Sequence, residues 1–313
     1  MGDGPPIRWA FGAPTERLAW RRYWIRDTAR GLSALVLHRL FALLPVAVGS
    51  AIGGVIALTM APMDLSLVTR ARANIARLRP DLADRAEAMT TRLWENIGRT
   101  LAEVTSTSRL WKSGRIAVRG IEQLQAVQAG NRPRIFITVH TGDWELLSPV
   151  LIREGEVVRH IYQPQPNRFR RRIASESRSA FPGVLVEPNP AGVREVVRHL
   201  SDRRGALVIF VDEIAGGVVQ APALGRPLSL SGNLATAVRL ALLTKALVLP
   251  AAMARTRGCN FELLLGAPVE LDGDPRQPSD LRRGVERLDP LTEALVLDRL
   301  DQWVMLPKLK LPS

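Results

Sequence analysis

The chain is poor in cysteine and shows no internal repetition. A single cysteine, Cys259, excludes a scaffold held together by disulfides. No self-similar period runs along the 313 residues, which argues against a repeat architecture. With 46% hydrophobic residues, the chain is too apolar to be disordered and can bury the core of one large domain or two small ones.

Lysine is also scarce, because only four of the 43 basic residues are lysine. The formal net charge of +13 is therefore carried by arginine, and it favours an anionic partner: nucleic acid, a membrane surface, or a phosphorylated or acidic substrate. A biased genome composition is the other explanation for the arginines. The guanidinium fork suits phosphate recognition, so only the positions of the arginines can distinguish a phosphate-binding role from a composition bias.

Several nucleotide and metal signatures are absent. The chain has neither a P-loop nor the glycine fingerprint of a dinucleotide site. Its four histidines share no metal-ligand spacing, and Cys259 lies far from them in the sequence. We therefore expect no metal and no bound cofactor.

The amino-terminal part is apolar and predicts association with a membrane. Residues 40–63 carry no charge, although Pro45, Gly49, Gly53 and Gly54 interrupt the run. The preceding residues 9–39 mix tryptophan and tyrosine with arginine, a composition typical of membrane interfaces. We expect an apolar helical segment over residues 1–63 that spans the membrane or lies in its interface, and no cleaved signal peptide. The alternative is a helical hairpin packed on the main domain.

Residues 64–313 form the second predicted domain, in three parts. Residues 64–114 have apolar side chains at helical spacing, with a break at Arg79-Pro80, and residues 272–313 are expected to be a helical tail. Between them, short runs rich in valine and isoleucine alternate with helical stretches over 115–271. This alternation predicts an α/β fold with a mostly parallel sheet flanked by helices. The expected strands cover 135–139, 157–163, 184–187, 206–211, 246–249 and 261–265, and the expected helices cover 144–153, 167–180, 189–203 and 231–245.

Polar residues close two of these strands, at His140 and Asp212. Ligands of parallel sheets bind outside the carboxyl ends of the strands, so both residues are candidate site residues. Histidine is the side chain that takes up a proton near neutral pH, and a nearby carboxylate can orient its ring. The motif around His140 holds no serine or cysteine nucleophile, which favours general-base activation of a substrate hydroxyl. The alternative is a buried histidine with a structural role.

The residues His140-Thr-Gly-Asp-Trp-Glu145 resemble a specific family motif. A strand followed by His-x4-Asp/Glu at a helix start is the signature of the glycerolipid acyltransferase-like fold. The form His-x-Gly-x-Trp-Glu is similar to the bacterial lipid A biosynthesis lauroyl/myristoyl acyltransferases and the related phosphatidylinositol mannoside acyltransferases. Further blocks agree in order over about residues 35–305, namely Asn74 with Arg79-Pro80, Gly98 to Glu103, Val118 to Glu122, Tyr162-Gln-Pro, Arg178, Asp212-Glu213 and Gly225-Arg226-Pro227.

The resemblance implies an O-acyltransferase at the cytoplasmic face of a bacterial inner membrane. It gives the role of base to His140 and that of its orienting carboxylate to Glu145. Acyl carrier protein or acyl-coenzyme A would be the co-substrate, and a lipid A precursor the acceptor, without nucleic acid. We also expect substrate contacts from the five residues Asp143, Trp144, Arg178, Asp212 and Arg226.

Three departures from the family pattern concern the acceptor. Asp143 stands where asparagine is usual, the loop before Gly225 lacks the usual phenylalanine, and the segment 301–306 retains Gln302-Trp303 without the pattern that normally follows. The acceptor therefore stays open between a lipid A precursor, a lysophospholipid, a glycolipid and an aminolipid. The four arginines within residues 168–172 suit a lipid phosphate or an acidic carrier protein, or they form a solvated helix face.

Two other functions compete with acyl transfer. One is a basic protein that binds membranes or nucleic acid without catalysis. The other is a hydrolase of the same fold, in which His140 would activate water.

Overall fold

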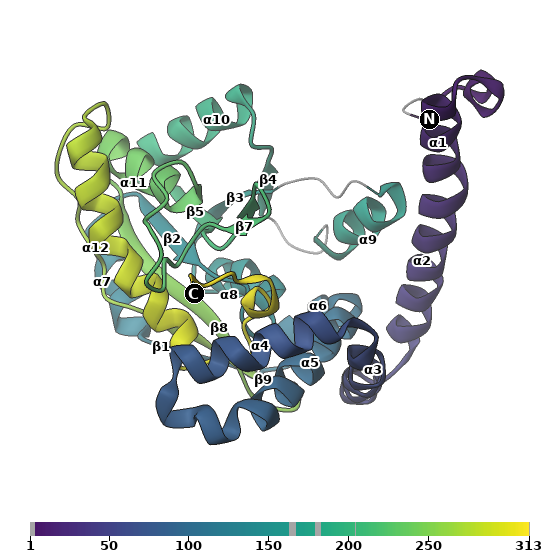
Figure 1. The fold of residues 1–313 in the computed structure, drawn as a ribbon. Helices are drawn as coiled ribbons and strands as arrows, with labels where there is room; N and C mark the ends of the chain where they lie inside the picture. Colours follow the sequence, from purple (N-terminus) through teal and green to yellow (C-terminus); the bar gives the residue numbers. More distant parts are fainter. Residues whose placement is uncertain (1–3, 163–166, 179–182, 204, 313) are drawn as a thin grey trace.

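A computed structural model describes residues 4–162, 167–178, 183–203 and 205–312 (Figure 1). Its centre is a seven-stranded sheet in the order β1-β9-β8-β2-β5-β3-β4. All neighbouring strands pair in parallel except β8 and β9, which are antiparallel. The strands are β1 (Ile116–Arg119), β2 (Arg134–Thr138), β3 (Val157–Ile161), β4 (Val184–Val186), β5 (Gly205–Phe210), β8 (Leu247–Arg257) and β9 (Asn260–Leu265). The predicted mostly parallel α/β fold is confirmed.

The two faces of the sheet are covered by different helices, because successive side chains of a strand point to opposite faces. Ile135 and Ile137 of β2 belong to a core shared with five helices: α4 (Leu65–Leu78), α5 (Ala86–Glu103), α10 (Pro190–Ser201), α11 (Asn233–Thr244) and α12 (Pro278–Leu297). Phe136 points the other way, into a core shared with α6 (Thr107–Trp111), α7 (Ile121–Ala129) and α8 (Leu147–Arg153). Burial on both faces explains why the strands read as continuous apolar runs.

The structure adds to the elements that the sequence pattern predicted. Strand β8 extends to Arg257, well beyond the predicted end at residue 249, because its pairing with β9 overrides a stretch of proline and alanine that favours no strand. Helix α7 and the two-stranded sheet of β6 (Ile214–Ala215) and β7 (Val218–Val219) were not predicted. The predicted helix over 144–153 is a short 3₁₀ turn, Trp144–Leu146, followed by α8.

The amino-terminal helices are α1 (Pro14–Arg21), α2 (Asp27–Leu43) and α3 (Val46–Met60). Figure 1 shows α1 and α2 standing beside the body as one long purple arm, which meets α9 (Arg168–Arg178). Among the described residues no single helix is long and apolar enough to cross a membrane, and α3 passes that test only together with α4, to which it is bent by 103°. The division of the chain at residue 63 stays a prediction.

Helix α3 packs closely against α5 through glycines. A Cβ atom built on Gly53 would come within 2.5 Å of the carbonyl oxygen of Gly98, and one on Gly98 within 2.2 Å of the carbonyl oxygen of Gly53. These distances are far below ordinary contact, so the two backbones touch only because both positions lack a side chain. The apolar segment is thus joined to the helix that carries Thr100 and Glu103.

Candidate active site

His140 follows the end of β2, and Asp212 follows the end of the neighbouring strand β5. Two contacts join them: Nδ1 of His140 lies 2.7 Å from Oδ1 of Asp212, and the backbone N–H of His140 donates to Oδ2 at 2.8 Å. The indole N–H of Trp303 donates to the same Oδ2 at 2.9 Å. Asp212 and Trp303 are fully buried, whereas 24% of the His140 side chain is exposed.

This arrangement fixes the form of the imidazole. A carboxylate only accepts hydrogen bonds, so the Nδ1 atom of His140 carries the hydrogen that Asp212 accepts. In the neutral ring the other nitrogen, Nε2, is then the one with a free lone pair. The side chain is therefore arranged to take a proton at Nε2 and to hold the resulting positive charge beside a buried carboxylate.

Aromatic rings border the imidazole on two sides. The ring of Phe210 lies 4.2 Å from that of His140, tilted by 31°, and the ring of Trp144 meets it edge-on at 5.4 Å. These contacts fix the plane of the imidazole in addition to the bond that it donates to Asp212. Trp144 was predicted as a substrate-binding residue; its position beside His140 is compatible with that role.

The turn after His140 is held on three sides. Thr141 forms an isolated bridge with Trp303, and its hydroxyl donates to the carbonyl of Met253 at 2.9 Å. Gly142 has a φ of +55°, and a Cβ atom there would lie 2.7 Å from the carbonyl oxygen of Met253, so only glycine fits. The carbonyl of Gly142 accepts a bond from the hydroxyl of Thr100 at 2.9 Å.

The two acidic residues of the motif differ in their surroundings. Asp143 is fully buried, and neither of its carboxyl oxygens has a hydrogen-bond partner among the described residues. Burial, and next the charge of Glu103, raise the pKa of Asp143 well above its ordinary value. Glu145 is half-buried in the 3₁₀ turn Trp144–Leu146. Glu145 was predicted to orient His140; in the structure the Nδ1–H group of His140 donates to Asp212.

Glu213, next to Asp212, also has an unusual environment. One carboxyl oxygen accepts the backbone N–H of Asn233 at 2.6 Å, at the start of α11, and the other is buried without a partner in the described part of the chain. Burial is the main cause that raises the pKa of Glu213 to about 7. This carboxyl therefore titrates near neutral pH within the electrostatic reach of His140.

Arg226, which was predicted to bind substrate, is directed towards its own loop. Its guanidinium donates to the backbone carbonyls of Ala223, Val219 and Pro222 at 2.6–2.8 Å. These three bonds occupy most of the donors of the side chain and hold the loop in shape. The bonding of Arg226 thus supports a structural role.

The remaining predicted arginines lie on α9. Arg178 is the last residue of this helix, and its side chain is outside the described part of the structure. Arg168 donates to the hydroxyl of Thr28 at 2.8 Å and stacks on the Tyr23 ring at 4.5 Å, so it fastens α9 to the amino-terminal helices. Arg172 pairs with Glu176 at 2.8 Å.

Several residues around the site were not predicted from the sequence. The role of Trp303 is the clearest example, although Gln302-Trp303 had been noted as a retained motif. Gln302 exchanges two hydrogen bonds with the backbone of Arg255, at 2.8 and 3.0 Å, which fixes the segment that carries Trp303. Within the described ranges, no group of three His, Cys, Asp or Glu side chains is arranged to hold a metal ion.

Comparison with known families agrees with the predicted resemblance. A family model described as bacterial lipid A biosynthesis acyltransferase matches residues 21–310, which is nearly the whole chain. A search among curated proteins gave no match. The match includes the sheet, the His140 turn and the Trp303 segment, and it implies acyl transfer to a lipid A precursor. The chain therefore belongs to the bacterial lipid A biosynthesis acyltransferase family.

Proposed function

We propose that His140 is the general base in the transfer of a fatty acyl chain from a thioester to a hydroxyl group of a lipid A precursor. The observation that carries this proposal is the contact between His140 Nδ1 and the buried Asp212, which leaves Nε2 as the basic atom. The donor is an acyl thioester of acyl carrier protein or of coenzyme A.

The proposed reaction needs no covalent enzyme intermediate. Nε2 of His140 takes the proton of the acceptor hydroxyl as its oxygen attacks the thioester carbonyl. The tetrahedral intermediate then breaks its carbon–sulfur bond, and the imidazolium returns the proton to the leaving thiolate. Asp212 stabilises the imidazolium between these two steps, as the carboxylate of a catalytic triad does.

Glu145 is proposed as a second carboxylate that assists His140. Glu145 is half-buried in the 3₁₀ turn Trp144–Leu146, and its negative charge is proposed to favour the protonated ring during the transfer. The ring of Trp144 meets that of His140 edge-on, and Trp144 is proposed to contact the acyl chain or the acceptor.

The test is acyl transfer by the detergent-solubilised protein. Labelled acyl carrier protein and acyl-coenzyme A are each offered with a lipid A precursor, a lysophospholipid, a glycolipid and an aminolipid, and products are identified by mass spectrometry. We expect one acylated lipid from the wild type and a loss of about 10²-fold or more in His140→Ala. His38→Ala, a histidine on α2 outside the site, is the matched control and keeps the wild-type rate.

Three other outcomes would contradict the proposal. Equal rates for the wild type and His140→Ala would remove this residue as the base. Release of free fatty acid without acylated lipid would identify a hydrolase. Salt-sensitive binding to nucleic acid without any product would support the non-catalytic alternative.

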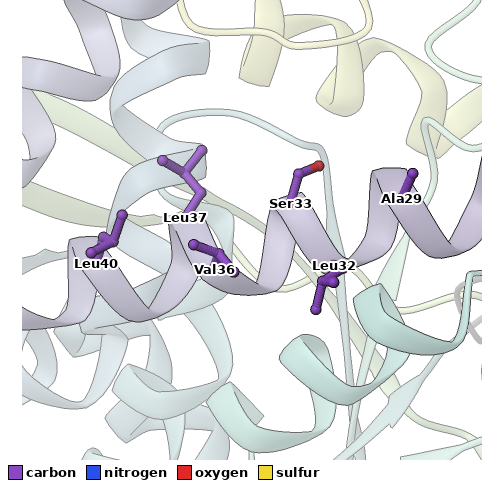
Figure 2. Close-up of a pocket in the computed structure, with 6 residues that line it drawn as sticks. All are labelled: Ala29, Leu32, Ser33, Val36, Leu37 and Leu40. Carbon is purple, nitrogen blue, oxygen red and sulfur yellow. The ribbon is translucent and has the colours of Figure 1, made fainter.

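We further propose that the enzyme associates with the bacterial inner membrane through α2 and α3, from the cytoplasmic side. A hollow of about 570 Å³ on α2 is lined by Ala29, Leu32, Ser33, Val36, Leu37 and Leu40, whose side chains are drawn in Figure 2. Leu37 and Leu40 are 47% and 56% exposed, and α3 exposes Val48, Ile52 and Val55. Exposed apolar side chains in such number are typical of a surface that meets lipid.

Sedimentation with vesicles tests this association. We expect Leu37→Glu combined with Leu40→Glu to lower the bound fraction on phosphatidylethanolamine–phosphatidylglycerol vesicles. Leu243→Glu, an equally exposed leucine on α11, is the control and should bind as the wild type does. Equal binding of all three proteins would contradict a role for α2.

A further inference from the structure

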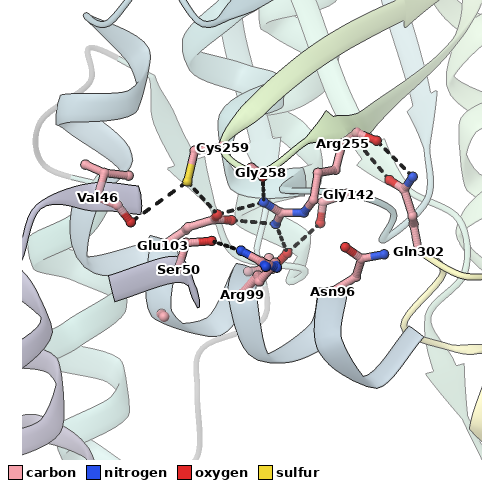
Figure 3. Close-up of polar contacts among 12 residues, drawn as sticks. Val46, Ser50, Asn96, Arg99, Glu103, Gly142, Arg255, Gly258, Cys259 and Gln302 are labelled. Atoms are coloured by element: carbon pink, nitrogen blue, oxygen red, sulfur yellow. Dashed lines mark hydrogen bonds and ion pairs between the residues drawn. The ribbon is translucent and has the colours of Figure 1, made fainter. Parts of the chain in front are cut away.

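A buried ion pair joins α5 to β8 next to the His140 turn (Figure 3). Both carboxyl oxygens of Glu103 accept bonds from Arg255, at 2.7 Å from Nη1 and 2.5 Å from Nη2. Only 5% of the Arg255 side chain and none of the Glu103 side chain is exposed. An ion pair removed from water in this way stays stable only while its partners remain matched in charge and geometry.

The ion pair is connected to the turn through Thr100. Nη2 of Arg255 donates to the hydroxyl of Thr100 at 3.0 Å, and this hydroxyl donates to the carbonyl of Gly142 at 2.9 Å. Figure 3 labels Arg255, Glu103 and Gly142 among these contacts. Because Gly142 is two residues from His140, the position of Arg255 bears on the position of the base.

Asp143 is the next residue, and it brings a second carboxyl group into the same buried region. Its two oxygens have no hydrogen-bond partner in the described part of the chain, and the Nε atom of Arg255 likewise has none. The charged groups that act on Asp143 are Glu103 from α5, Arg255 from β8 and Glu145 from the following 3₁₀ turn. Two of the three are negative, and the one cation is already bound by both oxygens of Glu103.

We propose that Asp143 is a positioning residue that acts as a neutral carboxylic acid and thereby keeps Arg255 bound to Glu103 and Thr100. An ionised Asp143 would be a buried charge near the carboxylates of Glu103 and Glu145, and it would compete with Glu103 for Arg255. Movement of Arg255 would then free Thr100, and with it the carbonyl of Gly142. The raised pKa that burial gives Asp143 agrees with the neutral form.

The positioning role of Asp143 predicts how the rate of acyl transfer depends on pH. This prediction rests on the proposed function of His140. At high pH the rate falls because Asp143 ionises and the turn is released. An asparagine at this position keeps the shape of the side chain but has no proton to lose, so it should remove only the alkaline fall.

The first test compares the pH profiles of the wild type and Asp143→Asn. We expect an alkaline fall of about tenfold per pH unit in the wild type and no such fall in Asp143→Asn. Asp81→Asn, which changes an exposed aspartate paired with Arg79, is the control and should keep the wild-type profile. Identical alkaline limbs in the wild type and Asp143→Asn would overturn the proposal.

The second test needs no acyl transfer, so it separates this inference from the proposed function. An acid with a raised pKa in the folded state lowers stability progressively as pH rises from its ordinary pKa of 3.8 to the raised value. We therefore expect the melting temperature of Asp143→Asn to exceed that of the wild type by a margin that grows from pH 4 to pH 7. If Asp143→Asn melts below the wild type at pH 7 by a margin that shrinks towards pH 4, the carboxyl is ionised and stabilising, and the proposal is wrong. A protein that melts as expected but transfers no acyl group would refute the function alone.

Discussion

Replacing Asp212 by asparagine tests how the base is arranged. In the wild type, Oδ2 of Asp212 accepts two N–H groups, from the backbone of His140 and the indole of Trp303, and Oδ1 accepts Nδ1–H. The asparagine amide has only one oxygen, so it cannot accept at both places. Its orientation therefore decides which form of the imidazole is stable.

With the amide oxygen in the place of Oδ2, both N–H donors keep their partner. The NH₂ group then faces Nδ1, which must accept, so the hydrogen of the imidazole moves to Nε2 and the base is lost. The opposite orientation preserves the basic Nε2 but leaves the N–H of His140 and that of Trp303 without an acceptor. A buried unsatisfied donor costs about 1–3 kcal/mol, so the productive orientation lies about 2–6 kcal/mol above the other.

This difference converts into a rate. Since 1.36 kcal/mol corresponds to a factor of ten, kcat should fall by roughly 30-fold to 25,000-fold in Asp212→Asn, with KM little changed. The assay is single-turnover acyl transfer with the donor and acceptor found for the wild type. Trp303→Phe is the companion variant: it removes one donor, preserves Nδ1–H, and should lose less than Asp212→Asn. An Asp212→Asn enzyme within threefold of the wild type would refute the reasoning, because His140 would then need no buried acceptor.

Three further predictions follow from the described contacts. Arg255→Met leaves Glu103 buried without a cation and should lower the free energy of unfolding by about 3–5 kcal/mol in a denaturant titration. The control Arg119→Met breaks the more exposed pair with Glu262 and should change this free energy by less than about 1 kcal/mol. Equal losses in the two variants would contradict the burial argument. The pKa of Glu213 is raised from 4.5 to about 7, so its ionisation lowers the stability of the wild type as pH rises between these values. The free energy of unfolding of Glu213→Gln should therefore increase relative to that of the wild type over this window, by at most about 3 kcal/mol. A difference in melting temperature that stays constant from pH 5 to pH 8 would be inconsistent with this prediction. Glu145→Gln should lower kcat by about tenfold, less than Asp212→Asn, because its carboxylate is proposed to act by charge rather than through Nδ1; a greater loss than that of Asp212→Asn would make Glu145 the principal partner.

The parts of the fold that could be predicted are those that local pattern encodes. Buried parallel strands are continuous runs of valine and isoleucine, so β2 and β5 were predicted within a residue or two of their ends. The polar residues that close these strands, His140 and Asp212, were candidates because adjacent parallel strands end at one edge of the sheet.

Contacts between distant segments have no such pattern. Nothing near Trp303 in the sequence indicates that its indole meets Asp212, 91 residues earlier. The sequence also gives no sign that Arg226 binds the carbonyls of its own loop, since an exposed and a folded-back arginine have the same neighbours in sequence. The family resemblance gave the role of orienting carboxylate to Glu145, whereas the carboxylate bonded to Nδ1 of His140 in the structure follows the neighbouring strand β5.

The wide separation of the site's parts also bears on how the protein folds. Residues 140 and 212 are 72 apart, Thr100 and Gly142 are 42 apart, and Glu103 lies 152 residues from the arginine that neutralises it. Contacts between such distant segments form slowly, because long loops must close before any contact is gained. During synthesis α3 and α5 emerge long before β8 and the Trp303 segment, so Glu103 and the apolar faces of these helices have no native partner for most of that time. Early exposure of these surfaces makes the nascent chain prone to aggregation, and enzymatic activity becomes a sensitive measure of complete folding.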